Sequence, residues 1–133
     1  MTIYNILGAI GIKLCKQFGV YKYSCDANRK WAKLLALIVM DRKLLIKSFG
    51  DFCIPEEIAL EVEGFLGNTF HPPSLSTPKD VLKVIREIDA QLEQQTCRGF
   101  EGNPFWENEY FFDHPDWIAI RQKAQRVLFK NSS

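Results

Sequence analysis

The sequence predicts an all-α protein, a single helical domain over residues 1–133 built as a bundle of about five helices, with an irregular aromatic-rich segment at residues 96–113. Three observations support this prediction. Apolar residues recur at helical spacing in five segments, and a recognisable cap or breaker begins or ends each of them. No segment shows the alternation of apolar and polar residues that is typical of a strand. The length is that of one domain, which can bury a core without metals or disulfides.

The first two predicted helices lie in the amino-terminal part of the chain. Apolar residues follow helical spacing from Ile3 to Leu14, and Gly19 ends this helix. Asp26 is a suitable N-cap for the second helix, which is expected to continue to Phe49. The middle of the second helix is apolar nearly all round, which favours a central position in the fold.

The third and fourth predicted helices each begin at a proline. Pro55, followed by two glutamates, suits the first turn of the third helix, where acids face the positive end of the helix dipole. Thr77 is the expected cap of the fourth helix, and Pro78 is its first residue. The expected buried stripes are Ile58, Val62, Phe65 and Leu66 in the third helix, and Val81, Leu82, Ile85, Ile88 and Leu92 in the fourth.

The last predicted helix begins at Pro115 and runs to Leu128, with Asp113 or His114 as its cap. The irregular segment before it contains glycines and a proline, which break regular structure. A short hairpin within that segment is the main alternative to the all-helical prediction.

Composition and spacing exclude several classes of protein. The cysteines form no C-x-x-C pair, so the sequence indicates no zinc site, and free thiols are expected at Cys15, Cys25, Cys53 and Cys97. The first 19 residues lack the pattern of a secretion signal, which predicts a cytoplasmic protein. The longest apolar run, residues 34–40, is far shorter than the ~20 residues that a bilayer requires, so no membrane span is expected.

The sequence predicts that the protein is not an enzyme and holds no metal or other cofactor. His71 lies beside two prolines in a loop, and His114 lies at a helix start. A neighbouring aspartate could orient His114 as a general base, but a histidine at this position is more often only the end of a helix. No glycine-rich phosphate loop follows a strand.

Charge is segregated along the chain, although the formal net charge is only +1. Residues 1–50 carry nine basic and two acidic residues, and residues 51–113 carry four basic and thirteen acidic ones. The remaining residues carry four basic residues and one acidic residue. Either the two parts attract each other within the fold, or one of them presents an electrostatic field to a partner.

The strongest local feature is a mixture of rings and acids at residues 100–117, with seven aromatic and five acidic residues. Two interpretations are open. Large rings are mostly buried, so they could close the end of the helical core. Aromatic residues are also enriched at interfaces, where acids beside exposed rings would suit a basic partner.

In its size, expected cytoplasmic character, lack of catalytic motifs and acidic-aromatic patch, the chain resembles small bacterial immunity proteins that neutralise a cognate toxin. The resemblance implies a protein-binding module that binds a basic toxin domain, such as a nuclease domain, and blocks its active site. It implies that the toxin is encoded by an adjacent gene. The residues expected to bind the partner are Glu101, Trp106, Glu107, Glu109, Tyr110 and Asp113.

Two alternatives stay open. A nucleic-acid-binding protein would use the basic first part, where Arg29, Lys30 and Lys33 lie on one side of the second predicted helix. The acidic second part would repel a long polyanion, which weighs against a nucleic-acid partner. A general adaptor or chaperone would fit the same features as an immunity protein.

Overall fold

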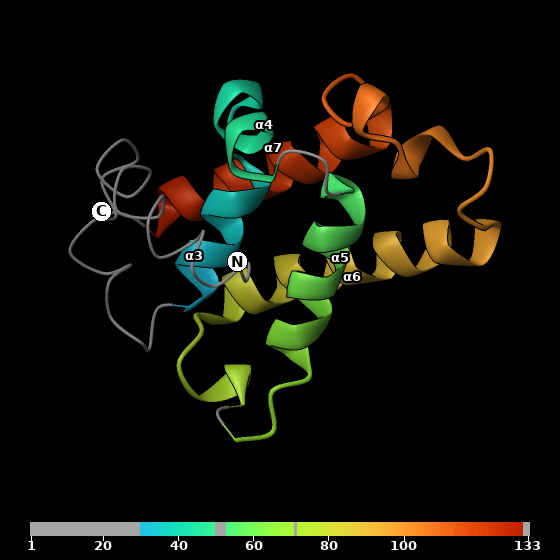
Figure 1. Ribbon diagram of the computed structural model, residues 1–133. Helices are drawn as coiled ribbons and strands as arrows, with labels where there is room; N and C mark the ends of the chain where they lie inside the picture. Colours follow the sequence, from blue (N-terminus) through green and yellow to red (C-terminus); the bar gives the residue numbers. More distant parts are fainter. Residues whose placement is uncertain (1–29, 50–52, 71, 132–133) are drawn as a thin grey trace.

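The structure, a computed structural model, describes residues 30–49, 53–70 and 72–131 (Figure 1). All regular structure in these residues is helical, which confirms the predicted all-α class. The helices are α3 (Lys30–Ile38), α4 (Arg42–Phe49), α5 (Ile54–Leu66), α6 (Lys79–Arg98) and α7 (Pro115–Lys130), with short 3-10 turns η2 (Pro73–Leu75), η3 (Pro104–Trp106) and η4 (Asn108–Tyr110). The first predicted helix, and Asp26 as the cap of the second, lie outside the described residues.

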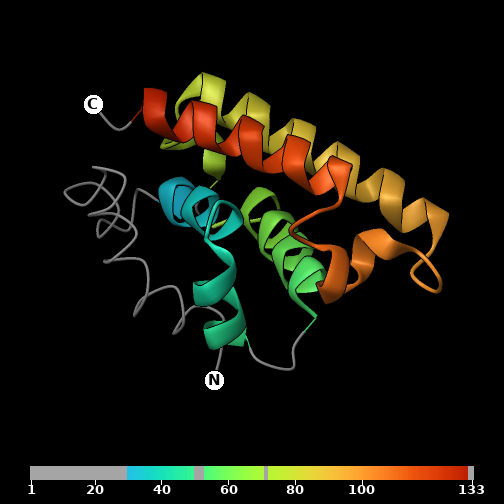
Figure 2. The same ribbon diagram turned by 90° about the horizontal axis from the view of Figure 1, so that it is seen from above.

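Four of these helices enclose a common interior. α6 and α7 run antiparallel and side by side in one layer, and α3 and α5 lie against them in a second layer (Figure 2). Contacts link α3 to α7, α7 to α6, α6 to α5, and α5 back to α3. α4 projects from the end of α3, away from the two layers (Figures 1 and 2). The bundle is therefore closed by four helices, and α4 extends it at one end.

The second predicted helix is in fact two helices, so the expectation of one helix continuing to Phe49 is wrong. The apolar run at residues 34–40 is buried as predicted, but α3 ends at Ile38 within that run. The carboxylate of Asp41 then accepts a hydrogen bond of 2.9 Å from the amide of Leu44. This bond caps a new helix, because a side-chain oxygen just before a helix commonly accepts from an amide of its first turn. The helix is therefore interrupted between Ile38 and Arg42, and α4 runs in a different direction from α3.

α5 begins at Ile54, one residue before the predicted start at Pro55, and ends at Leu66. Pro55 lies in its first turn, and the amide of Gly67 closes it by donating to the carbonyl of Glu63 at 2.9 Å. Of the predicted stripe, Ile58 and Val62 are fully buried, whereas the two later residues are only partly buried. Gly64 interrupts the exposed side of the helix, at a cost of roughly 1 kcal/mol relative to alanine.

α6 buries the whole predicted stripe of aliphatic residues, but its start differs from the prediction. The expected cap, Thr77, makes no side-chain hydrogen bond within the described residues, and its hydroxyl is buried. Pro78 occupies the cap position instead, because its backbone is extended (ψ 144°) while its carbonyl accepts the first helical bond, 2.9 Å from the amide of Leu82. α6 also continues to Arg98 and so includes the first three residues of the segment predicted to be irregular.

α7 begins at Pro115, and the structure selects His114 as its cap. The Nδ1 atom of His114 accepts a hydrogen bond of 3.1 Å from the amide of Asp116. None of the helices in the described part of the chain is long and apolar enough to cross a membrane. Cys53 and Cys97 are free thiols, and the other two cysteines lie outside the described residues.

We expect Ile88→Ala to lower the free energy of unfolding by about 2–5 kcal/mol, the range for truncating a buried aliphatic side chain. Ile88 is fully buried in the middle of α6. Arg86→Ala, on the exposed side of the same helix, is the control and should change the free energy by no more than about 0.5 kcal/mol. Urea unfolding followed by circular dichroism measures both. Equal effects of the two substitutions would contradict the assigned buried face.

Candidate functional site

Residues 99–114, here called the aromatic segment, connect α6 to α7 and pack against α5 (Figures 1 and 2). The segment contains η3 and η4 and, among the described residues, no strand, so the alternative of a short hairpin is excluded here. Gly99 and Gly102 have positive φ angles of 92° and 72°. Residues with a Cβ rarely adopt these angles, so the two glycines allow the chain to turn sharply after α6.

Most of the rings in and next to the aromatic segment are buried. Phe105 stacks on Trp117 of α7 with 4.5 Å between ring centroids, and Phe111 lies 4.7 Å from the same indole. Trp106 packs edge-on against Phe105 at 4.9 Å and is only 5% exposed. Trp106, one of the residues expected to bind the partner, is therefore not accessible as an anchor in this structure, because its ring is covered by this protein's own core.

Gln95, buried near the end of α6, connects three parts of the site. Its side-chain amide donates to the Asp116 carboxylate at 2.8 Å, and its side-chain oxygen accepts from the Asn103 amide at 3.1 Å. Its backbone carbonyl accepts from the indole N–H of Trp106 at 3.3 Å. These bonds satisfy polar groups that would otherwise be costly to bury, and they hold η3 between α6 and α7.

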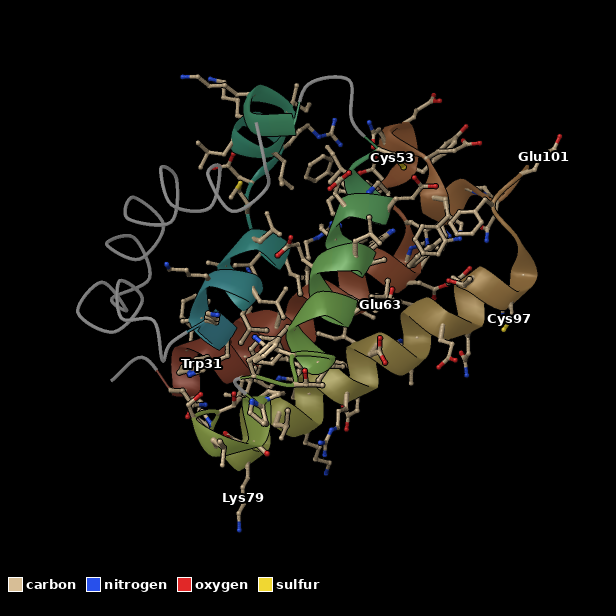
Figure 3. All side chains as sticks on the ribbon, turned by 60° about the horizontal axis from the view of Figure 1, so that its bottom comes forward. Trp31, Cys53, Glu63, Lys79, Cys97 and Glu101 are labelled. Atoms are coloured by element: carbon tan, nitrogen blue, oxygen red, sulfur yellow. The ribbon has the colours of Figure 1, made fainter. Side chains whose placement is uncertain are left out.

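Two further hydrogen bonds hold the aromatic segment to the start of α5. The Cys53 thiol donates to the carbonyl of Trp106 at 3.2 Å, and the amide of Ile54 donates to the Asn108 side chain at 2.7 Å. Burial raises the pKa of the Cys53 thiol, and the charges of Glu56 and Glu57 raise it further, although a hydrogen bond from the Glu56 backbone acts in the opposite direction. The raised pKa keeps the thiol protonated, which is the form that donates this bond. Figure 3 shows Cys53 at the start of α5, beside the aromatic segment.

Arg121 of α7 holds the other end of the aromatic segment. Its guanidinium donates to the carbonyls of Phe111 and Phe112 at 3.0 and 2.7 Å. The guanidinium of Arg42, from α4, lies 4.9 Å from the centre of the Phe112 ring and 3.6 Å from the Asp113 carboxylate. Burial lowers the pKa of Arg121, and the nearby charge of Arg42 adds to this effect, whereas Asp113 opposes it. Arg42, from the mainly basic residues 1–50, and Asp113, from the mainly acidic residues 51–113, thus form an ion pair within the fold.

The other predicted partner-binding residues lie on the outer surface of the aromatic segment. Glu101, Glu107 and Glu109 are exposed and form no ion pair within the described residues. Figure 3 shows Glu101 extending from the outer tip of the segment. Tyr110 is 42% exposed and follows Glu109 in η4. The structure thus groups Glu107, Glu109 and Tyr110 around one turn and places Glu101 on a separate one.

Phe100 is an exposed ring that the sequence did not single out as a binding residue. It is 46% exposed, and it leans on Trp106 with 4.7 Å between the ring centroids. The buried indole therefore supports the exposed ring. Its position directly after Gly99, at the outer turn, is the sequence signal that could have separated it from the buried rings.

A second acidic surface, on α5 and α6, was also missed, because the sequence explains Glu57 by its place in the first turn of a helix. Burial raises the pKa of Glu61, and the charge of Glu57 adds to the effect. Burial likewise raises the pKa of Asp89, with further contributions from Glu93 and Glu63. These carboxylates repel one another, and no cation in the described part of the chain pairs with them.

The sequence singled out His114 as a residue that a neighbouring aspartate could orient, and the structure places it at the start of α7. Nδ1 of His114 is occupied by the amide of Asp116, so this histidine acts as a helix cap. No group of three or more His, Cys, Asp or Glu side chains in the described part is placed to hold a metal ion. His71 lies outside the described residues.

We expect Asp89→Asn to raise stability at about pH 7 by up to about 0.5 kcal/mol, the scale of solvent-screened surface effects, and to have no effect near about pH 3. A raised carboxyl pKa means that the folded state disfavours the charged form. This cost is absent below the ordinary pKa of 3.8 and is fully present above the raised pKa. Glu87→Gln is the control, because Glu87 lies 4.0 Å from Lys123 and should give no gain. Thermal unfolding at both pH values measures the difference, and a loss of stability in Asp89→Asn at neutral pH would contradict the repulsion.

The outer surface of the aromatic segment therefore combines three exposed carboxylates with two half-exposed rings, and buried rings and hydrogen bonds to α5, α6 and α7 support it from below. Comparison of the chain with protein-family models, with curated proteins and with solved structures found no match.

Proposed function

We propose that this protein binds a basic protein partner through the outer surface of the aromatic segment. The observation that carries the proposal is that Glu101, Glu107 and Glu109 are exposed and unpaired within the described residues, whereas Asp80 and Glu87 each lie within 4.0 Å of a lysine. Unpaired acids on a supported surface are available to complement lysine or arginine across an interface.

The support beneath this surface favours binding. Ordering a loop on association opposes binding, so a segment that is already held in place loses less entropy. Tyr110 and Phe100 are the rings that can be covered by a partner, and they replace Trp106 as the proposed aromatic anchors. The three glutamates around them would mainly speed the encounter with a basic partner and orient it.

The resemblance to immunity proteins extends this proposal to a biological role. A basic toxin domain, such as a nuclease domain, uses its positive charge to hold a phosphate backbone. An acidic surface that covers those basic groups would block the active site of the toxin by occupying it. The product of the adjacent gene is then the first partner to test.

The nucleic-acid alternative has less support in the described residues. Lys30 is exposed at the start of α3, Lys33 is half-buried, and Arg29 lies outside the described residues. No observation favours an adaptor or chaperone over a dedicated binding protein.

The test begins with capture of the partner from native lysate, and the binding rates of the purified partner are then measured at several salt concentrations. Tyr110→Ala should weaken binding by about 2 kcal/mol, mostly by faster dissociation, because it removes an anchoring ring. Glu107→Gln combined with Glu109→Gln should slow association and reduce its dependence on salt.

Gln122→Lys combined with Gln125→Lys is the matched control, because it changes the net charge equally on exposed positions of α7. It should bind like the wild type. Lys30→Glu combined with Lys33→Glu tests the nucleic-acid alternative against generic DNA and RNA. Normal partner binding by the glutamate variants, together with loss of nucleic-acid binding by the lysine variant, would refute the proposed function.

A further inference from the structure

α5 has an outward face that no other helix covers within the described part of the chain. Glu56, Leu60, Glu63 and Gly64 recur at helical spacing and are all exposed. Leu60 is 59% exposed, although it lies in the middle of a helix whose opposite side is buried in the core. Figure 3 shows Glu63 on the side of α5 toward α6.

At Gly64 no side chain projects from this face, so another chain could approach the backbone of α5 closely. A Cβ atom placed on Gly64 would meet no other atom within 4 Å, so nothing in the described chain requires a glycine there. Glycine inside a helix lowers the stability of that helix, so its presence in an open position is unexplained by the fold itself. Small residues allow the axes of two packed helices to approach closely, which gives this glycine a use if a second helix packs over α5.

Acidic residues lie on both sides of Leu60 and Gly64. Glu57 and Glu61 lie on one side, and Glu63 lies on the other with Asp89 and Glu93 of α6. The raised pKa values of Glu61 and Asp89 have burial as their main cause and neighbouring carboxylates as the next, and no cation contributes to either. Two rows of cations on a partner would relieve the repulsion on both sides.

We propose that the outward face of α5 is a docking site for a basic amphipathic helix of a partner protein. Leu60 would contact the apolar side of that helix, the helix backbone would approach over Gly64, and its lysine or arginine residues would meet the acids on both sides. This is the general mode in which an amphipathic helix lies on a complementary surface. The inference goes beyond the proposed function, because this face and the outer surface of the aromatic segment use different residues.

The test uses the full chain and a synthetic amphipathic helical peptide of leucine and lysine, with a leucine and glutamate peptide of the same pattern as the control peptide. Only the basic peptide should bind, and its chemical-shift changes should map to α5 and the adjoining side of α6. Gly64→Gln should weaken binding about tenfold, because a side chain then stands where the peptide backbone approaches. The same substitution should raise the midpoint of thermal unfolding, since glutamine is the better helix former.

Glu61→Gln combined with Asp89→Asn should also weaken binding and make it less sensitive to salt. Gln122→Lys combined with Gln125→Lys changes the net charge equally and should leave the affinity of the peptide unchanged. If Gly64→Gln binds the peptide as tightly as the wild type, or if the shift changes map elsewhere, the attraction is non-specific and the proposal is wrong. If the chain forms a dimer that Gly64→Gln dissociates while the peptide does not bind, the occupant is a second copy, which also overturns the proposal. The Tyr110 and Glu107 variants test the other surface, so each proposal can fail without the other.

Discussion

The packing of α5, α6 and α7 at one end of the described structure depends on the hydrogen bonds that the buried polar groups of the aromatic segment form with these helices. The sixteen residues between α6 and α7 form turn hydrogen bonds among themselves, and their other buried polar groups need partners elsewhere, since an unpaired polar group costs free energy when it is buried. Gln95 of α6, Cys53 directly before α5 and Arg121 of α7 supply some of these partners. The indole of Trp117 adds a hydrogen bond of 2.8 Å to the carbonyl of Phe105, directly beneath the stacked rings.

This anchoring divides the side chains of the segment into two groups with different consequences. Rings that face inward, such as Trp106 and Phe111, join the core of the bundle and stabilise the fold. Side chains that face outward, such as Glu107 and Tyr110, are held on a surface whose backbone is already ordered. The aromatic segment closes one end of the helical bundle, and its outer side therefore forms a preformed acidic surface with exposed rings. The proposed binding function rests on this surface.

The sequence predicts well whatever depends on periodicity within one helix. The buried stripe of α6 follows from local spacing and is confirmed, and α5 begins at Ile54, one residue before the predicted start at Pro55. The interruption of the helix before α4 was not predicted, because Asp41 was interpreted as a single charged residue that follows an apolar run. An aspartate at this position can also cap a new helix, as Asp41 does. Burial of some rings in this segment was one of two interpretations of the sequence, but which rings are buried could not be predicted, since the position of Trp106 depends on contacts such as that with Gln95, which only the folded chain brings about. The acidic face formed jointly by α5 and α6 was missed because its α5 members and its α6 members, such as Glu63 and Asp89, are more than twenty residues apart in sequence.

The hydrogen bonds and stacked rings should hold the aromatic segment as firmly as the helices beneath it. Hydrogen exchange of the indole N–H groups, followed by NMR, tests this claim directly, because the indoles of Trp106 and Trp117 both donate to backbone carbonyls within the site. We expect both indole protons to exchange as slowly as the central amides of α6, and Gln95→Ala to accelerate exchange at Trp106 more than at those amides. Rapid exchange of both indole protons while the α6 amides stay protected would show that the segment opens on its own, and would contradict the account.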